Sequence, residues 1–224
     1  MNKTTKKRYF YIHPEGWKFA SIFFVISTGF YFIWLPISLV GYSLTFFIIW
    51  FFRDPERLAP LDASKIVSSA DGKVCLIDEA VLPEELSMAP EKMKRICVFM
   101  NVFNVHVNRS PIEAVVEAIV YKKGQFLNAS LDKASDKNER SSLVLKTDAG
   151  INIIVVQIAG LIARRILGFV QPNKKLGQGE RFGLIRFGSR VDIYMPLNAI
   201  SECKLGDKVI AGETILASLP SIEA

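Results

Sequence analysis

Two different patterns of apolar residues divide the sequence. Residues 19–52 contain no charged side chain, and this stretch is interrupted only by Pro36 near its middle and Gly41 further on. It is longer than the roughly 20 residues that one membrane-crossing helix needs. Because proline breaks a helix from within, the pattern predicts two short helices at about residues 19–34 and 38–52. We expect them to form a hairpin that associates with a membrane.

The remainder of the chain shows a period typical of strands. Short segments rich in β-branched and aromatic residues alternate with turn residues such as Asp71-Gly72 and Gly206-Asp207, as in mainly β folds. The sequence therefore predicts a basic tail and membrane-associated helical hairpin over residues 1–60, followed by a β-rich barrel or sandwich over residues 61–224. The predicted strands cover residues 66–69, 73–78, 95–101, 104–108, 114–121, 143–147, 151–158, 183–186, 190–195 and 214–218. A short helix is expected at residues 161–169.

One hairpin motif occurs near the end of this domain. Residues 206–213 (GDKVIAGE) place glycines at both corners of alternating apolar positions, and they resemble the half-motif of biotinyl and lipoyl carrier domains. Residues 70–74 (ADGKV) echo the motif weakly at the other end of the domain. The resemblance implies a small barrel with pseudo-twofold halves. No lysine stands at a hairpin tip where a carrier would be modified, which disfavours a carrier function.

Charge and cysteine content narrow the class of protein. The net charge is +6, which suits a membrane surface or an anionic substrate. No stripe of basic residues is interleaved with aromatic ones, so we expect no nucleic-acid partner. The three cysteines, Cys75, Cys97 and Cys203, lie among apolar residues without metal-ligand spacing. We therefore expect reduced core thiols in a domain that faces the cytosol, and no metal site.

The strongest chemical signal is a Gly-Ser pair that interrupts an apolar β segment. Gly188 and Ser189 lie between residues 183–185 and 191–194, which read as strands. Glycine lets the backbone bend until the serine hydroxyl can reach the preceding carbonyl. Gly-Ser pairs in general form a β-bulge or tight turn, and the same geometry also permits self-cleavage by attack of Ser189 on Gly188. The pair alone leaves both interpretations open.

Two polar residues could serve such chemistry. The sequence has two histidines, and His13 lies in the basic tail. His106 lies in a predicted strand, where alternation would make it share a face with Asn104 and Asn108. Polar neighbours on that face favour a functional site over a structural histidine. Asp71 lies at a glycine turn, where a turn-forming role is the simpler interpretation.

Four motifs in order resemble one enzyme family. They are residues 53–57 (RDPER), 70–74 (ADGKV), 105–109 (VHVNR) and 187–190 (FGSR). Their order and spacing are similar to those of phosphatidylserine decarboxylase proenzymes, and closest to the short bacterial and archaeal subgroup. The resemblance covers nearly the whole chain. The longer forms carry Leu-Gly-Ser-Thr at the last motif, and a further histidine where this chain has Phe103.

The resemblance implies a self-processing, pyruvoyl-dependent enzyme. Ser189 would attack Gly188, and β-elimination would split the chain into a β subunit (1–188) and an α subunit (189–224). Ser189 would become a covalent pyruvoyl group, with His106 as the base and Asp71 orienting it, as in hydrolytic triads. The pyruvoyl ketone would form a Schiff base with phosphatidylserine and accept the electrons released with CO₂, which gives phosphatidylethanolamine.

Further expectations follow from the same resemblance. Arg190, Arg53 and Asn108 are candidate substrate-binding residues. The enzyme would be a homo-oligomer at the bacterial inner membrane, with its catalytic domain on the cytoplasmic side. Two alternatives remain at this point: a pyruvoyl decarboxylase acting on another amino-acid substrate, and a membrane-tethered, lipoyl-like barrel that acts as an adaptor without enzymatic activity.

Overall fold

The computed structural model describes residues 10–60, 62–127, 129, 137–161, 165–186 and 188–220. Its contacts divide the chain between Glu56 and Arg57 into two compact units. We describe each unit by itself.

The N-terminal unit is a helical hairpin closed by a short two-stranded sheet. Its elements are β1 (Phe10–Ile12), α1 (Pro14–Tyr31), α2 (Leu35–Phe51) and β2 (Arg53–Pro55), and β1 pairs with β2 in antiparallel fashion. His13 caps α1, because its ring nitrogen Nδ1 accepts the Glu15 N–H at 3.3 Å. Prolines occupy the first turn of both helices, where an amide hydrogen would have no helical partner.

The helix pair was predicted, but its bounds were not. Helix α1 begins five residues before the expected start, and Pro36 lies in the first turn of α2 instead of separating the helices. Neither of the two helices that the structure describes combines the length and hydropathy needed to cross a bilayer. Many large apolar side chains on both helices are nevertheless exposed, among them Phe24, Val25 and Phe46.

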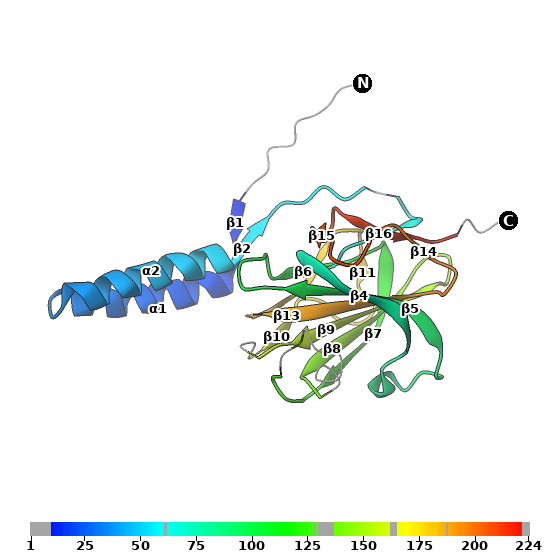
Figure 1. Cartoon of the computed structure of the whole chain (residues 1–224), viewed down its shortest axis with the longest axis horizontal. Helices are drawn as coiled ribbons and strands as arrows, with labels where there is room; N and C mark the ends of the chain where they lie inside the picture. The colour runs from blue at the N-terminus through cyan, green and yellow to red at the C-terminus, as the bar shows by residue number, and fades with distance from the viewer. Residues whose placement is uncertain are drawn as a thin grey trace, which may run out of the picture. The chain divides into compact units, whose positions relative to one another are not determined.

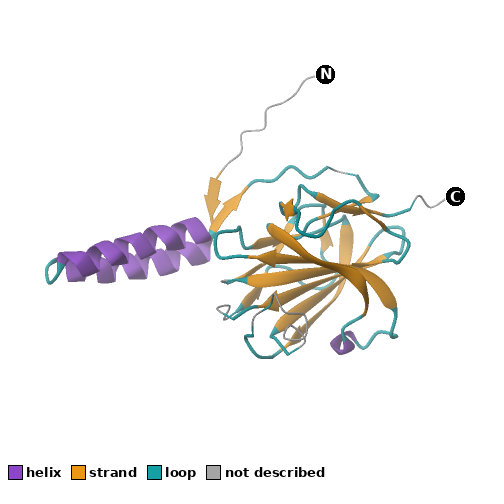
Figure 2. Ribbon diagram, in the orientation of Figure 1, coloured by secondary structure: helices purple, strands orange, loops and turns teal. Residues whose placement is uncertain are grey.

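The second unit is built around one large antiparallel sheet, curved into a half-barrel (Figures 1 and 2). Strand β13 occupies its interior, paired with β9 on one side and β5 on the other. The strand order is β11 (Lys175–Leu176), β7 (Ala114–Lys122), β8 (Arg140–Lys146), β9 (Asn152–Ala159), β13 (Ser189–Met195), β5 (Lys92–Met100), β4 (Gly72–Val81) and β15 (Lys208–Val209).

Two smaller antiparallel sheets complete the second unit. One has the order β10 (Ile166–Gly168), β12 (Arg181–Ile185) and β6 (Val107–Arg109), and the other β14 (Ile200–Ser201), β16 (Ile215–Ser218) and β3 (Lys65–Val67). A short 3₁₀ helix, η1 (Glu84–Leu86), follows β4. The fold is therefore mainly β, as predicted.

Strand alternation gives the large sheet two buried faces. On β9, Ile153 and Val155 belong to the main core cluster, whereas Ile154 and Val156 belong to a second, smaller cluster. Successive side chains of a strand point to opposite faces, so the main cluster defines an inner face and the smaller one an outer face. These two names are used below.

The two glycine motifs that echo each other in the sequence meet in space. Strand β15 pairs with the start of β4, with Lys208 opposite Lys73 and Val209 opposite Gly72. The pairing continues through the Val74 N–H, which donates to the Asp207 carbonyl at 2.9 Å. The motifs therefore lie side by side in antiparallel orientation at the edge of the large sheet.

Two local predictions were wrong. His106 was expected in a strand over residues 104–108, but strand β6 begins only at Val107 and His106 lies in the preceding loop. Because Val105, His106 and Val107 are all buried, alternation did not identify a polar face. A short helix was expected at residues 161–169, yet Ile166–Gly168 is strand β10. Residues 162–164 lie outside the described part of the chain.

Candidate active site

The Gly-Ser pair lies where the large sheet begins its most enclosed strand. Ser189 is the first residue of β13, opposite Met100 of β5 and Ala159 of β9. Gly188 has φ +63°, in the left-handed region that favours glycine. Ser189 is fully buried. It is two residues from Val191, a member of the main core cluster, so its side chain points to the inner face.

The hydroxyl of Ser189 is an exception to ordinary core chemistry. Its Oγ is buried and has no hydrogen-bond partner among the described residues. An unpaired buried polar group costs about 1–3 kcal/mol, and such groups in native proteins call for a functional explanation. The left-handed glycine before the serine lets the backbone bend there, and the unpaired hydroxyl favours reactivity over a simple bulge.

His106 lies against this pair with its ring orientation fixed. The Gly188 N–H donates to His106 Nε2 at 3.3 Å, and His106 Nδ1 lies 3.0 Å from the Asn104 carbonyl oxygen. A carbonyl only accepts, so Nδ1 carries the proton and Nε2 presents its lone pair. His106 is therefore poised as a base beside the bond between Gly188 and Ser189.

Asp71 is held by two strong contacts. Its Oδ2 accepts a hydrogen bond from Arg57 Nη2 at 2.7 Å, and its Oδ1 accepts the Ala211 N–H at 2.8 Å. These contacts fix the carboxylate against the loop that follows β15.

Asp71 follows a segment that contacts the start of strand β6. The Arg109 N–H donates to the Ser69 carbonyl at 3.0 Å, and Asn108 Nδ2 lies 3.4 Å from the same oxygen. The orienting role of Asp71 remains a prediction.

Asn108 lies in the same buried region. Its side chain is fully buried, and its Nδ2 lies 3.7 Å from the Sδ of Met100, the residue opposite Ser189. Its Oδ1 accepts a hydrogen bond from Gln157 Nε2 at 2.7 Å. The structure therefore brings Ser189, His106 and Asn108 to one inner region of the fold.

Arg190 points away from that region. Its side chain lies on the outer face of β13, where Nε and Nη2 each donate at 2.7 Å to the carboxylate of Asp192. Arg190 and Asp192 are each 1 % exposed. This paired and buried guanidinium favours a structural role, and substrate binding by Arg190 remains a prediction that its geometry does not support.

Arg53, the other arginine expected to bind substrate, belongs to the N-terminal unit. Its Nη1 donates to the Trp50 carbonyl at 2.9 Å, and its guanidinium carbon lies 4.4 Å from the centre of the Trp50 ring. Such stacking over an indole is a cation–π contact. Arg53 thus closes the end of α2, and its role toward substrate remains a prediction.

The cysteines offer no competing nucleophile in this region. Cys75, Cys97 and Cys203 are all free thiols. Cys97 lies opposite Asp192 on β5, and burial, together with the nearby Asp192 charge, raises the pKa of its thiol. Because the thiolate is the reactive form, Cys97 stays protonated and inert.

A family model for phosphatidylserine decarboxylase matches residues 44–217. The chain belongs to the phosphatidylserine decarboxylase family. Enzymes of this family are lyases of phospholipid biosynthesis that convert phosphatidylserine to phosphatidylethanolamine with a covalent pyruvoyl group. They are associated with membranes. The expected activity, substrate and prosthetic group are thereby confirmed at the level of the family.

The residues around Ser189 fit the family's prosthetic group. A pyruvoyl group must form from a residue of the chain itself, and Ser189 offers an unpaired buried hydroxyl after a glycine in left-handed conformation. Among the described residues, no cluster of three histidine, cysteine or acidic side chains could hold a metal ion.

Sequence reasoning missed two residues that the structure brings next to this candidate site. Gln157 is a fully buried amide in an otherwise apolar strand, and that lone polar residue in a run of β-branched ones was the available signal. Gly160 left no such signal, because its importance comes from a contact across the sheet. A Cβ built on Gly160 would lie 2.2 Å from the carbonyl oxygen of Gly188.

The Gly160 contact makes a sharp prediction. In Gly160→Ala, the added methyl group would displace the Gly188 carbonyl, and we expect self-cleavage at Gly188-Ser189 to slow at least tenfold, since misplacement of about 1 Å costs far more than that in catalysis. Gly168→Ala is the matched control, because a Cβ there meets nothing within 4 Å. Cleavage is followed on denaturing gels over time. Equal cleavage rates for the two variants would contradict the role of this contact.

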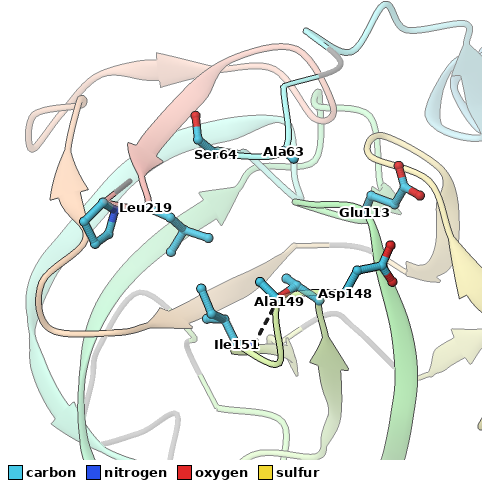
Figure 3. Close-up of a pocket in the computed structure, with 9 residues that line it drawn as sticks. Ala63, Ser64, Glu113, Asp148, Ala149, Ile151 and Leu219 are labelled. Carbon is cyan, nitrogen blue, oxygen red and sulfur yellow. Dashed lines mark hydrogen bonds between the residues drawn. The ribbon is translucent and has the colours of Figure 1, made fainter. Parts of the chain in front are cut away.

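A cavity in the second unit lies far from Ser189. A cavity of about 410 Å³ is lined by residues that include Ser64, Glu113, Asp148, Ile151 and Leu219 (Figure 3). Ile151 precedes the start of β9, whereas Ser189 is opposite Ala159 at the end of that strand. At roughly 3.3 Å per residue the two sites are about 25 Å apart along β9. This cavity is not part of the candidate active site.

Proposed function

We propose that Ser189 is the residue converted to the pyruvoyl group and that His106 is the base for its self-cleavage from Gly188. One observation carries the proposal: the unpaired, buried Oγ of Ser189 follows a glycine whose amide donates to His106 Nε2. The lone pair of Nε2 is thereby directed at the Gly188 amide, on the residue whose carbonyl would be attacked.

The steps balance within the chain. Ser189 Oγ attacks the Gly188 carbonyl carbon while His106 Nε2 takes the hydroxyl proton, and the C–N bond breaks as that proton passes to the nitrogen. The resulting ester loses the Ser189 α-proton, and its Cβ–Oγ bond breaks. Gly188 leaves as a carboxylate and residue 189 becomes dehydroalanine. Tautomerisation and addition of one water then release ammonia and leave the pyruvoyl group.

The fold prepares the mature site through its own residues. The pyruvoyl group supplies an electron sink for the departing CO₂. The inner face around residue 189, lined by Met100 and Ala159, excludes bulk water, and water exclusion strengthens electrostatic interactions. His106 would also return a proton to the product, because its Nε2 lies against Gly188, the neighbour of residue 189. Asp71 would support the charged form of His106.

We further propose that the helical hairpin rests on the surface of the membrane that holds the lipid substrate. Its exposed apolar side chains exceed what a solvated surface normally carries. The net charge of +6 would attract an anionic bilayer. Placement at the bacterial inner membrane with the catalytic domain on the cytoplasmic side, membership of the short subgroup and assembly of several chains belong to the same proposal.

Charge placed on the hairpin should weaken membrane binding. For the double variant Val25→Glu and Phe46→Glu we expect at least a tenfold loss of binding to vesicles containing phosphatidylserine, because each carboxylate opposes insertion. Leu205→Glu is the matched control, since Val25, Phe46 and Leu205 are each 68 % exposed. Co-sedimentation with vesicles measures the effect. Equal loss in the control would show that the hairpin has no special part in binding.

The decisive test of the proposed cleavage is the mass of the fragments. The purified chain should separate on a denaturing gel into residues 1–188 and 189–224. Mass spectrometry should find the short fragment with a pyruvoyl group in place of its first serine, and Edman degradation should find it blocked. An intact chain, or a cut elsewhere, would refute the assignment of Ser189. The lipoyl-like adaptor requires the intact chain, and the paired motifs at β4 and β15 would then be its main feature.

A further inference from the structure

A buried pair of amides stands in the otherwise apolar core. Gln157 and Asn108 are both fully buried, and Gln157 Nε2 donates to Asn108 Oδ1 at 2.7 Å. Gln157 lies on β9 between Val155 and Ala159, which both belong to the main core cluster, so its side chain points to the inner face. Gly183 leaves room for it, because a Cβ there would lie 2.9 Å from Gln157 Nε2.

The direction of this amide pair is fixed by the backbone. Asn108 Nδ2 lies 3.4 Å from the Ser69 carbonyl oxygen, and only the amide nitrogen can donate to a carbonyl. Asn108 therefore presents its oxygen Oδ1 to Gln157, so Gln157 must donate through its nitrogen Nε2. The free end of the pair is Gln157 Oε1. That oxygen is buried and has no hydrogen-bond partner among the described residues, so it can bind only a hydrogen-bond donor.

The free end lies close to residue 189. Ala159, two residues along β9 from Gln157 and on the same face, is opposite Ser189. Met100 is opposite Ser189 from the other side, and its Sδ is 3.7 Å from Asn108 Nδ2. The amide pair and the side chain of Ser189 thus share the inner face at one end of β13.

We propose that Gln157 Oε1 binds the amino group of the serine headgroup and orients it toward residue 189. This inference rests on the proposed conversion of Ser189. The amine must be neutral to attack a ketone, and a carboxylate at this position would favour its protonated form. An uncharged amide oxygen orients the amine through an N–H without holding the extra proton. Asn108 and the Ser69 carbonyl act as positioning groups behind Gln157.

The inference is tested by changing Gln157 and the lipid headgroup, singly and together. Gln157→Met keeps the length of the side chain but removes the acceptor. Self-cleavage should proceed as in the unchanged chain, while kcat/KM for phosphatidylserine falls about tenfold, as expected for one hydrogen bond in a buried site. The inhibition constant of the analogue whose headgroup carries hydrogen in place of the amino group should change less than about twofold in the same variant, because that analogue offers no N–H to Gln157. Reductive capture of phosphatidylserine by the short fragment with cyanoborohydride should fall by the same factor as kcat/KM.

The controls distinguish failure of this inference from failure of the proposed conversion of Ser189. Gln178→Met is the matched control, because Gln178 donates only at the surface, to the carbonyls of Asp62 and Lys65. A loss for the analogue without the amino group equal to the loss for phosphatidylserine in Gln157→Met would assign Gln157 to packing and overturn the inference. If that variant does not fold, Gln157→Asn, which withdraws the amide by one methylene, should show the same difference between the two lipids. Loss of folding or of cleavage in both variants would also overturn it, whereas an unprocessed unchanged chain would refute the role of Ser189 itself.

Discussion

Ser189→Ala is expected to leave a single full-length chain without decarboxylase activity. The variant removes the only atom that can attack Gly188 in the proposed cleavage, and no pyruvoyl group can form from alanine. Folding should be unaffected, because Ser189 Oγ has no hydrogen bond among the described residues. Deleting an unpaired buried hydroxyl is neutral or stabilising. Denaturing gels, a decarboxylation assay in vesicles and thermal melting measure the three outcomes.

The matched control for this change is Ser142→Ala. Ser142 is equally buried and lies on β8, and its Oγ makes only a long contact of 3.5 Å with Glu85. We expect this variant to cleave and decarboxylate normally. Cleavage between residues 188 and 189 in Ser189→Ala would show that another group performs the attack.

His106→Ala is expected to slow self-cleavage by about 10²–10⁴-fold, the usual contribution of a positioned general base. The variant loses the Nε2 lone pair that accepts the Gly188 N–H. It also releases the loop whose Asn104 carbonyl holds the ring. Time courses on denaturing gels, starting from freshly synthesised chain, give the rate. Added imidazole should restore part of it.

The other histidine of the chain provides the control. His13 caps helix α1 in the N-terminal unit, so His13→Ala should shorten that helix at its start without changing the cleavage rate. Cleavage of His106→Ala at the original rate would remove His106 from the mechanism. Asp71 could then no longer be assigned a role through it.

The strands that could be predicted are the long ones. Strands β5, β9 and β13 lie within three residues of their expected bounds, because each is a run of at least seven residues rich in apolar side chains. The two-residue strands β11, β14 and β15 have no period to detect. The prediction for residues 161–169 failed for a related reason: three residues of β10 cannot be distinguished from a helical turn by pattern alone.

The site was predictable where a residue type carries its own chemistry. A serine after glycine and a histidine in an apolar β segment are visible in sequence, and the order of four motifs indicated the family. The structure adds what depends on distance. Arg190 is adjacent to Ser189 in sequence but lies on the opposite face of β13, paired with Asp192. Gly160 and Gln157 lie near the site because β9 pairs with β13. That pairing cannot be predicted from a local sequence pattern.

The interior position of β13 has a consequence for the life of the mature enzyme. Strand β13 is flanked by β5 and β9, while β15 and β16 further along the same fragment pair with β4 and β3. The proposed cut before Ser189 would therefore leave the two pieces interlocked. Once heat separates them, recovery requires an encounter between two molecules, so it should depend on concentration and compete poorly with aggregation. An uncut chain needs no second molecule to refold. The cleaved enzyme should therefore recover from heating less completely than the uncut chain.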